Sequence, residues 1–243
     1  MIYSLKKRRR PVKFQAMKED DLKGAEAILF DFEGTLVDPQ WNLEQAIRET
    51  SEMLAASGFP VDRLQARTHS TLMKEATEMA SEIGQSPDEV RERIGTIYDR
   101  FDEDALTRWT LRSGARDFLH RLKAKGIKTG LVSNAGKKTL IKAFQKLDLR
   151  QLFDVMVTRN DVKILKPSGE GLNLALSRLQ VTKEKALYVG DSLDDIQAAK
   201  EAGLKVIIIL GGEDPRADLL SARPDFLIKN FGELLASLGE ESS

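Results

Sequence analysis

The sequence predicts an α/β fold, a doubly wound parallel sheet with a helical segment inserted after its first strand. From Ser113 onward, short β-rich apolar runs alternate with helical segments, which is the pattern of right-handed βαβ units. Before that point, residues 40–108 show helical periodicity without a strand, although an apolar run at 27–31 precedes them. We therefore expect an α/β core from 25–39 and 110–243, a helical cap from 40–109, and a poorly ordered basic leader from 1–24.

Composition excludes several classes of function. The 243 residues carry 38 Lys and Arg against 38 Asp and Glu, so no overall field favours nucleic acid or an anionic membrane. The chain has no cysteine, which excludes disulfides, thiolate nucleophiles and cysteine metal ligands. Its longest apolar run, 206–210, is too short to span a membrane. We expect a cytoplasmic protein without nucleic-acid or membrane partners. The basic run 6–10 is either a nucleic-acid or localisation patch or, as we favour, a frayed leader.

The expected elements follow from apolar spacing and from glycine and proline breaks. In the insertion, apolar stripes predict helices near 43–54, 64–83 and 90–101, separated by the breaks at 58–60 and 84–87, with Ser86 as N-cap and Pro87 as first helical residue. In the core we expect strands at 27–31, 128–133, 154–158, 186–190, 205–210 and 225–228. The core helices are expected at 115–125, 137–147, 169–179 and 193–202, with a short one from 231.

Polar groups gather where the predicted strands end, the edge at which open parallel sheets bind ligands. Each group also has a purely structural explanation. Asp31 and Glu33 could lie in a surface turn, Ser133 and the acids at 191–195 could cap helices, and Lys166 could simply be exposed. Three adjacent acids repel one another unless a cation lies among them, and oxygen ligands without cysteine favour Mg²⁺. The groups are Asp31 and Glu33, Ser133 and Asn134, Lys166, and Asp191, Asp194 and Asp195.

In this order, the four motifs resemble those of the haloacid dehalogenase superfamily of phosphatases. The run Gly190-Asp191-Ser192 with Asp195 and the helix to Gly203 is the most specific part, and the phosphoglycolate-phosphatase-like members are closest in pattern. The resemblance implies a Rossmann-like core, an α-helical cap and a Mg²⁺ cofactor.

The resemblance also implies roles for individual residues. Asp31 would be the nucleophile and a metal ligand, and Glu33 the general acid and base, with its backbone carbonyl on the metal. Asp191 would bind the metal. The remaining implied roles are phosphate binding by Ser133 and Asn134, charge neutralisation by Lys166, and outer-shell positions for Asp195 and Thr35, the latter orienting Glu33 or its turn.

One residue departs from the usual pattern, because Glu33 stands where aspartate is usual. A carboxylic acid there still favours an oxygen leaving group, so we expect hydrolysis of a small phosphorylated metabolite. The alternatives are a phosphosugar mutase of the same fold and a non-enzymatic binding protein with a weakened site. We expect His69, His120, Trp41 and Trp109 to be structural, while helical phase leaves open whether Arg67, His69 and Lys74 read the substrate. These motifs encode neither the substrate nor the oligomeric state.

Overall fold

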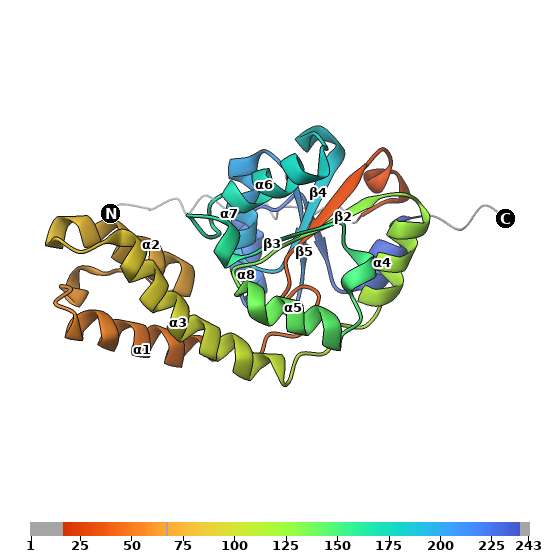
Figure 1. Ribbon diagram of the computed structural model, residues 1–243. Coiled ribbons are helices and arrows are strands. Elements are labelled where there is room, and N and C mark those ends of the chain that lie inside the picture. Colours follow the sequence, from red (N-terminus) through yellow and green to blue (C-terminus); the bar gives the residue numbers. More distant parts are fainter. Residues whose placement is uncertain (1–16, 67, 239–243) are drawn as a thin grey trace, which may run out of the picture.

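A six-stranded parallel sheet organises residues 17–66 and 68–238, which the computed structural model describes (Figure 1). The strand order is β3-β2-β1-β4-β5-β6, with β1 in the interior between β2 and β4. Helices cover both faces, so the predicted doubly wound α/β fold is confirmed. None of the helices within these residues is long and apolar enough to cross a membrane.

The strands lie where the sequence predicts them, each boundary within one residue. They read as continuous apolar runs because both faces of the sheet are covered; all four residues of β1 are fully buried. Their bounds are β1 Ala27–Phe30, β2 Lys128–Val132, β3 Val155–Val157, β4 Ala186–Gly190, β5 Lys205–Ile209 and β6 Phe226–Ile228.

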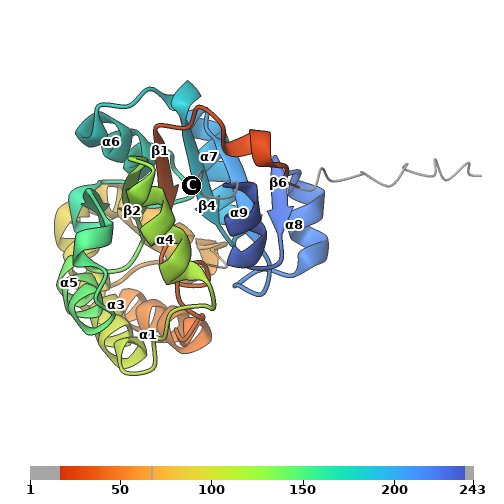
Figure 2. The ribbon, with the colours of Figure 1, turned by 90° about the vertical axis from the view of Figure 1, so that its right-hand side faces the viewer.

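Two helical layers enclose the sheet and bury separate apolar clusters. One layer contains α4 (Ala115–Ala124), α5 (Lys137–Lys146) and α9 (Phe231–Ser237), whose apolar faces share a cluster with Phe30. Figure 2 shows α4 and α9 side by side. The other layer contains α6 (Glu170–Leu179), α7 (Leu193–Ala202) and α8 (Arg216–Ala222). Helix α8, which has seven residues and begins after Pro215, was not predicted from the sequence.

The insertion between β1 and β2 forms three α-helices beside the core (Figure 1). They are α1 (Leu43–Ala56), α2 (His69–Ala80) and α3 (Pro87–Leu106). Asn42, Thr68 and Ser86 cap their N-termini, so the predicted start of α3 at Ser86 and Pro87 is correct. The helices bury an apolar cluster of their own, and Leu165 from the core packs into it.

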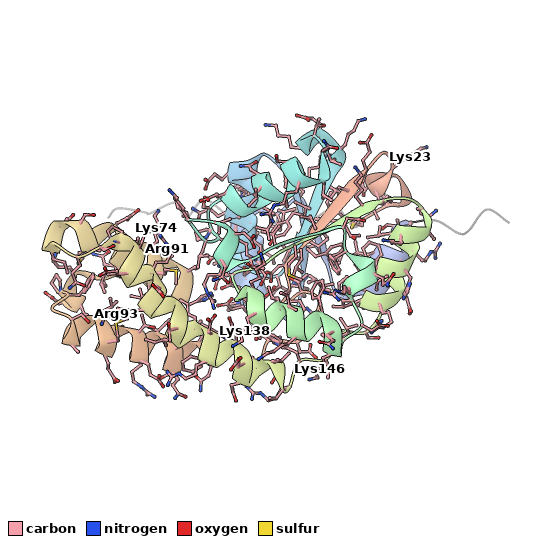
Figure 3. All side chains as sticks on the ribbon, viewed as in Figure 1. Lys23, Lys74, Arg91, Arg93, Lys138 and Lys146 are labelled. Carbon is pink, nitrogen blue, oxygen red and sulfur yellow. The ribbon has the colours of Figure 1, made fainter. Side chains whose placement is uncertain are left out.

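The end of the insertion also forms an ion pair and hydrogen bonds with α5. Glu103 on α3 pairs with Lys142 at 2.7 Å, and the Lys146 ammonium donates to the carbonyls of Leu106 and Thr107 at 2.8 and 3.0 Å. Lys138 and Lys146 lie along this face of α5 in Figure 3. The cationic Lys146 thus satisfies carbonyls that the end of a helix leaves free.

Part of the expected leader belongs to the packed core. Residues 19–22 form a 3-10 turn, and Leu22 is buried in the cluster that contains Phe30. Ordered packing therefore begins before residue 25. The basic run 6–10 lies outside the described residues.

Candidate active site

Four segments meet at the carboxyl edge of the sheet and line one cavity. Asp31 follows β1, Ser133 follows β2, Asp191 follows β4, and Lys166 comes from the loop before α6. The cavity has a volume of about 120 Å³ and is also lined by Glu33 and Asn134. Parallel strands bring these residues together because all their carboxyl ends lie at the same edge.

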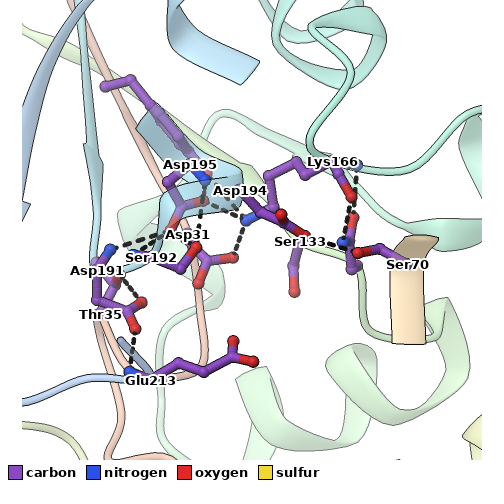
Figure 4. Close-up of polar contacts among 12 residues, drawn as sticks. Asp31, Thr35, Ser70, Ser133, Lys166, Asp191, Ser192, Asp194, Asp195 and Glu213 are labelled. Atoms are coloured by element: carbon purple, nitrogen blue, oxygen red, sulfur yellow. Dashed lines mark hydrogen bonds and ion pairs between the residues drawn. The ribbon is translucent and has the colours of Figure 1, made fainter. Parts of the chain in front are cut away.

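A buried lysine links the acids of the first and last motifs (Figure 4). The Lys166 ammonium donates to Asp31 Oδ1 at 2.5 Å, to Asp195 Oδ1 at 2.7 Å and to the Tyr188 hydroxyl at 3.0 Å. Burial alone would lower the pKa of Lys166, but Asp195 and Asp31 outweigh it and raise that pKa well above its ordinary value. Burial raises the pKa of Asp31 to about 6, even though Lys166 opposes the change. Lys166 therefore remains a cation and holds the Asp31 carboxylate in place.

Asp195 positions its neighbours through hydrogen bonds to both of its carboxylate oxygens. Its Oδ1 accepts from Lys166 and from Tyr188, the latter at 2.7 Å. Its Oδ2 accepts from the N–H groups of Asp191 and Ser192 and from the Ser192 hydroxyl, which caps α7. Burial would raise the pKa of Asp195, but Lys166 and these donors outweigh it and lower that pKa. Asp195 thus fixes both Lys166 and the Asp191 loop.

Asp191 is held in a tight space between two loops. The Thr35 hydroxyl donates to its Oδ1 at 2.8 Å, and the Glu213 N–H donates to its Oδ2 at 2.8 Å. Gly34 and Gly212 approach so closely that a Cβ on either would lie within 2.2 Å of an Asp191 carboxylate oxygen. The Thr35 hydroxyl therefore orients Asp191, whereas the resemblance implied that Thr35 would orient Glu33 or its turn.

The acids at this edge fit a divalent cation. Asp31, Asp191 and Asp195 each offer an oxygen, and the three oxygens lie within 4.8 Å of one another. Burial, together with repulsion from Asp195 and Asp31, raises the pKa of Asp191 well above its ordinary value. A cation relieves such repulsion, and a set of buried carboxylates with no sulfur or imidazole ligand is the chemistry that hard cations prefer.

The loop after β2 offers donors for an anion and also supports Lys166. The Ser133 hydroxyl accepts from the Ala135 N–H at 3.2 Å, which leaves its own proton available. The Asn134 side chain does not face a ligand. Its amide donates to the Lys166 carbonyl at 3.1 Å and accepts from the Lys166 N–H at 3.0 Å, so it clamps the lysine backbone. The Asn134 backbone N–H has no hydrogen-bond partner among the described residues.

Glu33 lies at the junction between the core and the insertion. Its Oε1 accepts from the N–H groups of Gln40 and Trp41 at 2.5 and 2.7 Å. No cation pairs with it in the described part of the chain, and burial raises its pKa to about 7 despite these two donors. Its carboxyl group lines the same cavity as Asp31, so it can exchange protons there near neutral pH.

The structure adds residues that the sequence analysis missed or interpreted otherwise. Tyr188 and Glu213 were missed, although Tyr188 lies in β4 and Glu213 in the loop after β5, and the ends of both strands meet at this edge. Trp41 and His69, expected to be structural, line the cavity, whereas Lys74 lines a different one. Arg67 lies outside the described residues.

A buried ionic cluster joins the insertion to the loop after β2, and it too was not predicted. Asp102 on α3 accepts from the Gly136 N–H at 2.7 Å and from the Trp41 indole at 2.9 Å. Arg159 pairs with Asp102 at 2.8 Å and Asp99 at 2.6 Å and donates to the Asn134 carbonyl. Separately, the Ser70 hydroxyl of the insertion donates to Asp194 at 2.6 Å.

A doubly wound sheet with a buried carboxylate–lysine site at its carboxyl edge and an inserted helical segment defines an α/β enzyme with a Rossmann-like core. The haloacid dehalogenase-like hydrolase family matches residues 28–209, and the chain belongs to this family. It is 28% identical over 239 residues to a phosphoglycolate phosphatase of Salmonella choleraesuis, covering 90% of this chain and 95% of that one. This likeness indicates an enzyme of the phosphatase type.

Solved structures agree with this assignment. A protein described as a haloacid dehalogenase-like hydrolase from Bacteroides fragilis superposes with a TM-score of 0.65 at 25% identity, over 86% of this chain and 99% of that one. A mutant of CbbY from Rhodobacter sphaeroides, in complex with xylulose-(1,5)bisphosphate, gives a TM-score of 0.62 at 26% identity, over 88% and 99%.

Proposed function

We propose that the chain catalyses the Mg²⁺-dependent hydrolysis of a small phosphomonoester through an aspartyl-phosphate on Asp31. The observation that carries this proposal is the buried Asp31 carboxylate, held by Lys166 at 2.5 Å and facing a cavity that Ser133 and Asn134 also line. An oriented carboxylate beside donors for phosphoryl oxygens is the arrangement that nucleophilic attack on phosphorus requires.

Two displacements at phosphorus complete the proposed reaction. An Asp31 oxygen forms a bond to phosphorus as the bond to the leaving oxygen breaks, and Glu33 gives that oxygen its proton. The Glu33 carboxylate then accepts a proton from water, whose oxygen attacks phosphorus, releases phosphate and restores Asp31. The pKa of about 7 at Glu33 supports both roles. Lys166 keeps the Asp31 carboxylate oriented, and the Ser133 hydroxyl and Asn134 N–H contact the phosphoryl oxygens.

We assign the cation to the acids at the same edge. Asp31, Asp191 and the Glu33 backbone carbonyl would hold Mg²⁺, and Asp195 would act from the outer shell through Lys166 and the Asp191 loop. When bound there, Mg²⁺ supplies positive charge that stabilises the phosphoryl group in the transition state.

The test is phosphate release from a panel of small phosphomonoesters, measured with Mg²⁺ and with EDTA. We expect wild type to be active only with the cation, and Asp31→Asn to lose at least about 10³-fold because its amide cannot act as the nucleophile. Asp148→Asn is the matched control, since the Asp148 side chain is 90% exposed. Activity that persists in Asp31→Asn would exclude this mechanism. Transfer to a second hydroxyl without phosphate release would instead indicate the mutase alternative.

A further inference from the structure

The insertion gives the cavity an aromatic wall. Trp41 and His69 line it, with ring centroids 4.7 Å apart, and Tyr98 packs against both at 5.4 and 5.5 Å. Hydrogen bonds fix the wall: the Tyr98 hydroxyl donates to the His69 carbonyl at 2.7 Å, and the Trp41 indole donates to Asp102 at 2.9 Å. A rigid wall of this kind offers a flat apolar face together with the polar atoms of one imidazole.

The His69 imidazole is neutral and has unused hydrogen-bonding capacity. Burial, with a contribution from the Arg159 and Lys166 cations, lowers the pKa of His69 to about 3. A neutral imidazole keeps one donor and one acceptor nitrogen. No described residue forms a hydrogen bond with this ring; its Nδ1 is buried, which leaves Nε2 as the nitrogen that a substrate in the cavity can reach. The ring can therefore bind a neutral polar group.

The charges around the cavity disfavour an anionic leaving group. Lys166 is the one cation among the described lining residues, and Asp31 and Asp195 already pair with it. Arg159 is buried behind the wall and is paired with Asp99 and Asp102. The carboxylates that line the cavity are Asp31, Glu33, Asp102, Asp191, Asp194 and Glu213. The Mg²⁺ assigned to Asp31 and Asp191 would be taken up by the phosphoryl group, so a second anionic group on the substrate would face the remaining acids without a cation of its own.

We propose that the cavity selects phosphomonoesters whose leaving alcohol is small, uncharged and hydroxylated, and that His69 hydrogen-bonds to a hydroxyl of that alcohol. Trp41 covers the carbon atoms of the leaving group, and the volume of about 120 Å³ limits it to a few carbons. This inference rests on the proposed function. It separates this chain from the relatives named for phosphoglycolate, a substrate with a carboxylate on its leaving group.

Matched substrates test the charge preference directly. Hydroxyethyl phosphate and phosphoglycolate share a carbon skeleton and differ in bearing a hydroxyl or a carboxylate, as do glycerol phosphate and phosphoglycerate. We expect wild type to favour the hydroxyl member of both pairs in kcat/KM by at least about tenfold. Arg67 is near His69 in sequence but lies outside the described residues, so its effect on the charge preference is measured with a separate variant. Arg67→Gln is expected to leave both ratios unchanged.

His69→Phe tests the hydrogen bond, because it retains the ring and removes both nitrogens. We expect a loss of about tenfold on hydroxyethyl phosphate and little change on ethyl phosphate, which lacks the hydroxyl. His120→Phe, on exposed α4 surface, is the matched control and is expected to change neither.

Four outcomes would overturn the inference: preference for the carboxylate substrates in wild type, equal preference, selectivity that depends on Arg67, or an equal loss on both esters in His69→Phe. The proposed function fails separately, if wild type hydrolyses none of the five esters.

Discussion

The pKa values of two buried acids, Asp195 and Glu33, are shifted in opposite directions because their partners differ. Asp195 is fully buried, yet Lys166 and several hydrogen-bond donors lower its pKa and keep it ionised. Glu33 accepts from two backbone N–H groups and pairs with no cation among the described residues, so burial raises its pKa to about 7. When two carboxyl groups have pKa values shifted apart in this way, one remains an anion and the other can gain and lose a proton near neutral pH. The acid–base role proposed for Glu33 follows from its partners.

Glu33→Gln tests that role through the leaving group. An alkyl phosphate needs a proton on its leaving oxygen, whereas nitrophenolate leaves without one. We expect the first-turnover rate to fall about 10²- to 10⁴-fold on an alkyl phosphate and much less on p-nitrophenyl phosphate, measured by rapid quench and by the nitrophenolate burst. In wild type, Glu33 must be protonated to act as the acid. The first-turnover rate on the alkyl phosphate should therefore fall as pH rises through about 7, while the rate of the nitrophenolate burst should not.

Glu44→Gln, on the exposed first turn of α1, is the matched control and should behave as wild type. Equal losses on both substrates in Glu33→Gln would show that the residue does not act as the acid.

At the scale of elements, the sheet was predictable and the placement of the insertion was not. Strand positions follow from short apolar runs, and the common carboxyl edge of a parallel sheet predicts that Asp31, Ser133 and Asp191 meet. The pairing of Asp102 with Arg159 depends on how α3 packs against the core, and helical periodicity shows only which face of a helix is apolar. Glu213 could have been found, because it lies in the loop that follows β5 at the same edge.

The loop after β1 gives a prediction about close packing. Gly34 has a φ of +82°, and a Cβ there would lie 2.2 Å from an Asp191 oxygen. Gly24 has the same φ, with nothing within 4 Å of its Cβ position. Gly24→Ala should therefore lower the unfolding free energy by about 1 kcal/mol, the cost of placing a residue with a Cβ at positive φ. Gly34→Ala should additionally displace Asp191, weakening Mg²⁺ binding and lowering activity at least about tenfold.

Isothermal titration with Mg²⁺ and urea unfolding distinguish the two glycine variants. If Gly34→Ala matched Gly24→Ala in cation affinity and activity, the tight packing around Asp191 would have no functional consequence.

At the scale of the whole molecule, contacts on several sides hold the insertion over the site. Ser70 bonds Asp194, Leu165 of the core packs among the helices of the insertion, and Arg159 connects α3 to the loop after β2. We expect these contacts to limit the access of bulk water to the cavity. The Arg159–Asp102 pair is the most buried of them, with the two side chains 4% and 2% exposed. It therefore couples the position of the insertion to the loop that carries Ser133.

Removing one member of this pair should loosen the molecule as a whole. Arg159→Met leaves Asp102 buried without its cation, so we expect a loss of about 3–5 kcal/mol in unfolding free energy and a raised KM. Asp102→Asn in the Arg159→Met background removes the unpaired charge and keeps a side-chain oxygen, and should recover part of that loss. Arg178→Met is the matched control: Arg178 is 40% exposed and pairs with Asp161 at 3.2 Å, so about 1 kcal/mol or less is expected. Urea unfolding of wild type, Arg159→Met, Asp102→Asn and the double variant gives the coupling energy of the pair, and Arg178→Met is unfolded alongside them. Equal losses in Arg159→Met and Arg178→Met, or no recovery in the double variant, would show that this buried pair does not hold the insertion in place.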